Sequence, residues 1–107
     1  MIGLAYKPGV SDDRESQSYT VMNLLKAKGA EVEYYDPCIH LIPPHRGHWS
    51  GQSSIDWNRE NLGRFAAAVI CSANQDVDYE QLADEIPIVI DACNIVPKDR
   101  KAQVIHA

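Results

Sequence analysis

The sequence predicts an α/β fold, specifically a three-layer Rossmann-like parallel sheet with flanking helices. Short apolar runs occur at residues 1–6, 67–71 and 88–92, and continuous runs of this length are typical of strands buried on both faces. Amphipathic segments with helical spacing lie between the strand-like segments. A strand, a helix and a second strand joined by short connections form a right-handed crossover, which makes the two strands parallel.

The first apolar run, residues 1–6, is expected to be a buried parallel strand. It begins abruptly, because a central strand normally has several more residues before its loop. We therefore expect that the chain was cut just upstream and that Met1 does not start the natural protein.

A helix is expected over residues 16–28. Ser16 is a good N-cap residue, and Glu15 would favour the positive end of the helix dipole. Gly29 follows the last turn, where a glycine commonly ends a helix. One apolar stripe should face the core, and its members are Val21, Met22, Leu24 and Leu25.

Residues 31–36 alternate apolar and polar side chains and are expected to form a half-covered strand that ends at Pro37. The following residues, up to 61, show no periodic pattern, and a segment of this length without elements is usually either functional or loosely ordered. The elements expected after it are a short helix at 61–66, a strand at 67–71, a helix capped by Asp78 and running to 85, a strand at 88–92, and a frayed edge strand or tail at 102–106.

Polar loops follow Tyr6, Cys71 and Ala92, each at the carboxyl end of an expected strand. Because parallel strands end at the same edge of a sheet, these loops should open on one rim, and open α/β sheets bind ligands there. This rim is therefore the expected binding site.

The composition points to one domain, residues 1–107, with 45% hydrophobic residues and a net charge of -5. The basic residues are not clustered, which disfavours a nucleic-acid partner. No apolar run approaches the roughly 20 residues that a membrane-spanning helix requires. We expect a soluble cytoplasmic protein with no nucleic-acid and no membrane partner.

A metal site is suggested by Cys38, His40, His45 and His48. Zinc ligands are usually spaced more tightly and paired with a second cluster, which the sequence lacks, so solvated loop histidines are the favoured interpretation. The three cysteines of the chain are odd in number and show no C-x-x-C spacing, so no disulfide framework is expected.

The loop after the first strand carries Tyr6, Lys7 and Arg14. An aromatic face beside positive charge suits a nucleotide base and its diphosphate. The sequence has no G-x-G-x-x-G turn of the dinucleotide-binding type. From the residues alone a structural alternative is favoured, in which Tyr6 packs in the core and both cations pair with neighbouring acids at the surface.

Two motifs in this loop, G-L-A-Y-K-P and D-D-R-E-S, resemble the opening of the C-terminal domain of the UDP-glucose/GDP-mannose dehydrogenase family. The later segments A-E-V-E-Y-Y-D-P, F-A-A-A-V-I and I-V-I-D-A-C-N-I fall where that domain has its second strand, its middle strand and its D-x-R-N turn. The resemblance spans residues 2–96. The long histidine- and proline-containing segment and D-Y-E-Q-L are more similar to the UDP-N-acetylhexosamine 6-dehydrogenases than to the UDP-glucose enzymes.

The resemblance implies an enzyme that oxidises the C6 alcohol of a UDP- or GDP-sugar to a carboxylate in two NAD-dependent steps, for polysaccharide precursor synthesis. It implies that Tyr6 and Lys7 contact the nucleotide-sugar and that Arg14 reaches toward the NAD diphosphate. In the family, the catalytic residues and the NAD fingerprint lie in other regions. No catalytic residue is therefore assigned here, the fragment alone is expected to be inactive, and the full-length protein is expected to be a homodimer or higher oligomer.

Two positions depart from the family pattern. The chain has Cys93 where the family usually has the arginine of D-x-R-N, and a cysteine cannot replace arginine's bidentate fork. It has Asn74 where many relatives place a histidine. Either the substrate differs, another cation substitutes or the activity is weakened. The competing interpretation is a non-catalytic Rossmann-like binding or interaction module.

Overall fold

A computed structural model describes residues 1–5, 13 and 16–106 of the chain. Three α-helices and three strands occur in this part, together with one short 3-10 helix. The helices are α1 (Gln17–Ala27), α2 (Arg59–Leu62), α3 (Tyr79–Glu85) and the 3-10 helix η1 (Gly47–Trp49), and the strands are β1 (Ala67–Ile70), β2 (Ile88–Asp91) and β3 (Gln103–His106).

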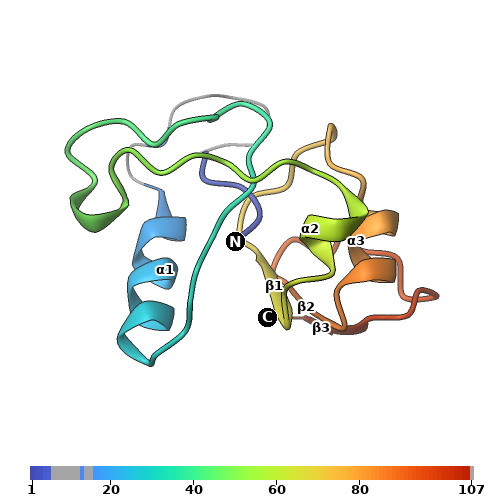
Figure 1. Cartoon of the computed structure of the whole chain (residues 1–107). Helices are drawn as coiled ribbons and strands as arrows, with labels where there is room; N and C mark the ends of the chain where they lie inside the picture. The colour runs from blue at the N-terminus through green and yellow to red at the C-terminus, as the bar shows by residue number, and fades with distance from the viewer. Residues whose placement is uncertain (6–12, 14–15, 107) are drawn as a thin grey trace.

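The three strands form a parallel sheet in the order β1-β2-β3. Single parallel bridges extend it beyond β1, since Ile2 pairs with Ile70 on one side and with Tyr35 on the other. Helices α2 and α3 lie together beside the strands, and α1 lies on the far side of the segment that starts the chain (Figure 1). The expected α/β, Rossmann-like arrangement is confirmed.

The predicted strands at 1–6 and 31–36 are wrong in length, because each is reduced to one bridge residue. The Ile2 N–H donates to the Val69 carbonyl at 2.8 Å, and the Gly3 N–H donates to the Tyr35 carbonyl at 2.9 Å. At Gly3 the backbone then turns into the left-handed region, with φ of 86°. The next two N–H groups bond to the side chain of Asp36 instead of a neighbouring strand.

Helix α1 confirms the prediction for residues 16–28 to within one residue at each end. The Ser16 side chain accepts a hydrogen bond from the Ser18 N–H at 3.2 Å, as an N-cap does. Met22 is fully buried, but Leu24 is 58% exposed, so its assignment to the buried stripe is wrong. At about 100° per residue, Leu24 lies about 200° around the helix from Met22 and faces away from the core.

In the second half, β1, β2 and α3 match their predictions closely, and Asp78 caps α3 through its side chain. The short helix predicted at 61–66 is instead α2, which begins at Arg59. Asn58 caps it by accepting the Asn61 N–H at 2.8 Å. The C-terminal segment forms the edge strand β3, which excludes the tail alternative.

Residues 37–57 form no long element, but they are well anchored. Trp49 of η1 is 2% exposed and belongs to a second apolar cluster with Met22 and Tyr34, apart from the main cluster around β1, β2 and α3. The Trp49 Nε1–H donates to Asn23 Oδ1 at 2.6 Å. This segment therefore packs against α1 instead of lying loosely on the surface.

Candidate functional site

The carboxyl ends of the strands meet at one rim, as the parallel topology requires. The loop after β1 contacts the two segments that follow Ile2 and Tyr35. A Cβ atom built on Gly3 would lie 2.5 Å from the Ser72 carbonyl oxygen, and the Asn74 Nδ2 lies 3.7 Å from the Cys38 Sγ. Because β1 and β2 are parallel and the Ala92 N–H donates to the Ile70 carbonyl at 3.2 Å, the loops after these strands leave the sheet at the same edge as the turn at Asp36.

Asp36 fixes the backbone of the first two segments that leave the sheet at this rim. One carboxylate oxygen accepts the N–H groups of Leu4 and Ala5 at 2.8 and 3.2 Å. The other accepts those of Cys38 and Ile39 at 2.7 and 3.2 Å. Asp36 is only 2% exposed, so a single buried carboxylate joins two segments about 32 residues apart. The sequence showed Asp36 only as the end of a strand before a proline, which is the signal of an Asx-type turn.

Asp91 likewise holds the backbone that follows β2. Its two carboxylate oxygens accept the N–H groups of Cys93, Ile95 and Val96 at 3.0, 2.8 and 2.8 Å. Burial alone would raise the pKa of Asp91, but these backbone donors lower it below its usual value. The carboxylate is therefore charged at neutral pH and holds the loop that follows it.

The two positions that depart from the family pattern are both built into the rim. Asn74 is buried, its N–H donates to the Tyr79 hydroxyl at 2.8 Å, and its Oδ1 accepts the Asp76 N–H at 2.9 Å. Cys93 is half-buried, and burial together with the charge of Asp91 raises the pKa of its thiol. Cys93 is therefore an uncharged thiol at neutral pH and supplies no cation to the rim.

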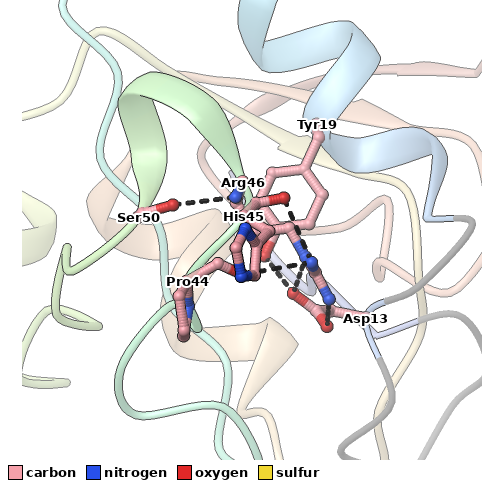
Figure 2. A network of polar contacts seen from close by, with 6 residues as sticks. All are labelled: Asp13, Tyr19, Pro44, His45, Arg46 and Ser50. Carbon is pink, nitrogen blue, oxygen red and sulfur yellow. Dashed lines mark hydrogen bonds and ion pairs between the residues drawn. The ribbon is translucent and has the colours of Figure 1, made fainter.

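A second polar cluster lies where α1 approaches residues 44–50, and it is centred on Asp13 (Figure 2). Arg46 binds the Asp13 carboxylate with two nitrogens, Nε to Oδ2 at 2.9 Å and Nη2 to Oδ1 at 2.8 Å. Tyr19 of α1 donates its hydroxyl to Oδ2 at 2.5 Å. Burial alone would raise the pKa of Asp13, but the hydrogen bonds from Arg46 and Tyr19 lower it. Burial and Asp13 both raise the pKa of the Tyr19 hydroxyl, which stays protonated.

Arg46 also organises the turn in which it lies. Its Nη1 lies 3.3 and 3.2 Å from the carbonyls of Pro44 and His45, and its backbone N–H donates to Ser50 Oγ at 2.8 Å. His45 has a positive φ of 66°. Sequence reasoning missed this cluster, because residues 13 and 46 are far apart in the chain and no local pattern connects them.

A solvent-open hollow of about 370 Å³ adjoins the rim beyond Asp36. Two aromatic rings, Tyr35 and Trp57, lie with centroids 4.6 Å apart in its wall. The Trp57 Nε1–H donates to Gln81 Oε1 at 2.9 Å and so fixes the indole ring. The remaining wall residues are Pro37, His40, Ser54, Ile55 and Asp56, together with Asp36.

The three residues predicted to bind nucleotide-sugar and cofactor, Tyr6, Lys7 and Arg14, lie outside the described residues. Their described neighbours are Ala5, held by Asp36, and Asp13, held by Arg46. The loop histidines His40, His45 and His48 are exposed. Within residues 1–5, 13 and 16–106, no group of three or more His, Cys, Asp and Glu side chains is placed to hold a metal ion.

An open parallel sheet with polar loops at its carboxyl edge defines a Rossmann-like α/β domain. The profile of the UDP-glucose/GDP-mannose dehydrogenase family, UDP binding domain, matches residues 1–98. The chain belongs to this family and comprises its UDP-binding domain. No significant match was found among curated proteins or among solved structures. None of the described helices is long and apolar enough to cross a membrane.

Proposed function

We propose that the chain is the nucleotide-sugar-binding domain of an NAD-dependent nucleotide-sugar 6-dehydrogenase. The observation that carries this proposal is the family match over residues 1–98, which includes the Y-K-P and D-D-R-E-S motifs of the sequence. Tyr6 and Lys7 contact the nucleotide-sugar, and Arg14 reaches toward the cofactor diphosphate. Positive side chains at these positions match the charge of a diphosphate.

The chemistry that follows from this assignment is the oxidation of the C6 alcohol to a carboxylate, a four-electron change that takes up one water molecule and reduces two NAD⁺ to NADH. Among the described residues, the carboxylates of Asp36 and Asp91 accept backbone N–H groups, so we assign them the role of holding loops. The sequence lacks a dinucleotide fingerprint, which supports the view that NAD is bound mainly by other regions of a longer protein. The isolated chain is then inactive but carries part of the substrate site.

The finer identity of the substrate is also part of the proposal. A UDP-N-acetylhexosamine fits the likeness of the histidine- and proline-containing segment and the D-Y-E-Q-L motif to the enzymes that use it. Such an enzyme would be a cytoplasmic homodimer or larger assembly that supplies polysaccharide synthesis.

Calorimetric titration of UDP, UDP-N-acetylglucosamine, GDP-mannose and NAD tests this function. Lys7→Ala should weaken UDP-sugar affinity by about 10- to 100-fold, the effect of losing one charge-assisted hydrogen bond. Lys28→Ala is the matched control, because Lys28 is exposed and follows the opposite end of α1. Absence of nucleotide affinity in the full-length protein would contradict the proposal.

The alternative is a non-catalytic binding or interaction module, and Cys93 favours it because this position supplies no cation. The same titrations separate the two. A nucleotide affinity that depends on Lys7 supports the dehydrogenase domain, whereas a folded full-length protein that binds no nucleotide supports the alternative.

A further inference from the structure

We propose that Arg46 is a positioning residue of the nucleotide site, acting through Asp13. This inference rests on the proposed function, because it concerns the same loop. Asp13 immediately precedes Arg14 in the chain and is bound by Arg46 through two parallel hydrogen bonds of 2.9 and 2.8 Å. A bidentate arginine–carboxylate pair fixes the direction of the carboxylate as well as its distance.

The Asp13–Arg46 pair, called the clamp below, is attached to helix α1. The turn at 44–50 is joined to α1 by the Trp49 hydrogen bond to Asn23 at 2.6 Å and by Lys26, whose Nζ lies 2.5 Å from His48 Nε2. Tyr19 of the same helix completes the clamp on Asp13. Asp13 is therefore held by two elements that are themselves held together.

The burial of this pair argues for a role in geometry over a role in stability. The Asp13 and Arg46 side chains are 6% and 21% exposed. Removing two charges from water opposes the attraction between them, so buried ion pairs add little net stability but can fix one arrangement among several. Asp36 fixes the start of the loop at Leu4 and Ala5. The clamp fixes its other end at Asp13.

The clamp also has an electrostatic consequence. Asp13 is a carboxylate in a segment whose cations would bind a diphosphate, and a free carboxylate there would repel that ligand. Its charge is matched by Arg46, and its oxygens are directed to Arg46 and Tyr19. The histidine- and proline-containing segment is thereby connected to nucleotide binding through Asp13.

The test compares Arg46→Ala, Arg46→Lys and Asp13→Asn with the wild-type chain, each alone, and adds the Arg46→Ala/Asp13→Asn double variant. Arg46→Ala should weaken the affinity for UDP by about tenfold, within the range seen for coupled neighbouring residues. Arg46→Lys should keep only part of the wild-type affinity for UDP, because lysine lacks the bidentate fork of arginine. The double variant should bind UDP no more weakly than the single variant with the lower affinity, since both substitutions remove the same contact.

The matched control is Arg64→Ala, which removes an exposed ion pair with Glu33 at 3.3 Å, away from the clamp. Hydrogen exchange of a peptide covering residues 1–20 provides a readout that needs no ligand. Faster exchange there in Arg46→Ala, but not in Arg64→Ala, supports the clamp even if the wild-type chain binds no nucleotide, an outcome that would count against the proposed function alone. Unchanged exchange or an unchanged UDP affinity in a binding-competent chain would overturn the inference.

Discussion

The half of the molecule around β1, β2 and α3 is held by a continuous backbone ladder over an apolar core. The half around α1 and residues 37–57 has its own apolar cluster but only isolated backbone hydrogen bonds, and buried polar side chains supply further contacts. In the first half, parallel pairing continues through every residue of three strands. In the second, separate polar contacts join the segments, and they are made by Asp36, by the Asp13–Arg46 pair and by Trp49 with Asn23. The difference shows that a polar segment without regular elements can still be placed closely, provided that buried side chains fix it at several points.

The largest effects should come from the two cores and should separate the two halves. Leu82, fully buried in α3, and Trp49, 2% exposed in η1, each anchor one of them. Leu82→Ala should lower the free energy of unfolding by about 2–5 kcal/mol and Trp49→Ala by about 3–5 kcal/mol, measured by urea unfolding. Hydrogen exchange should rise mainly in the strands for Leu82→Ala and mainly in residues 37–57 for Trp49→Ala. The same exchange pattern in both variants would show that the halves unfold as one unit.

A smaller effect is expected at the boundary between the halves. Gly3 has a positive φ, and a Cβ atom there would lie 2.5 Å from the Ser72 carbonyl. Gly3→Ala should lower the free energy of unfolding by about 2–4 kcal/mol, since backbone strain and a steric clash both contribute. Gly29→Ala is the control, because Gly29 has a similar φ and nothing within 4 Å of the added atom. Equal losses in the two variants would show that the approach to Ser72 is not tight.

The smallest effect depends on pH and reports on the clamp alone. The pKa of Asp13 is lowered in the folded state, so its ionised form stabilises the fold above the unfolded pKa of about 4. This contribution is lost as the pH falls through the lower, folded value. The stability difference between wild type and Asp13→Asn should therefore be constant above about pH 5 and shrink below about pH 4. Thermal unfolding from pH 3 to 7 measures it, and a difference that does not vary with pH would contradict the assigned ion pair.

The sequence was informative where structure is local. The spacing of apolar residues and the capping residues Ser16 and Asp78 placed α1 and α3, and the apolar runs placed β1 and β2. The strand at 1–6 was overestimated because Gly3 redirects the backbone toward Asp36, which no periodicity reveals. The predicted start of helix α2 lay two residues too far along the chain, because Asn58 was not recognised as its N-cap.

The candidate site was harder to predict for a physical reason. The motifs located its loop, but the contacts that hold this loop join residues 32 to 33 positions apart, such as Leu4 with Asp36 and Asp13 with Arg46. Such pairings follow from the tertiary fold and leave no trace in local spacing. The departure at Cys93 was readable from the sequence. Its physical consequence, a neutral thiol whose pKa is raised by burial and by Asp91, needed the surroundings of the residue.

The antiparallel bridge between Leu41 and Ser53 has a consequence for how this domain can vary. Together with the hydrogen bonds between Ile42 and residues 51 and 52, it closes the base of the segment. The tip beyond that base can be exchanged without shifting the sheet as long as Trp49 is kept, because its side chain belongs to the second apolar cluster. Arg46 lies in this tip, so an exchange that keeps Trp49 would change the contact with Asp13 and leave the strands in place.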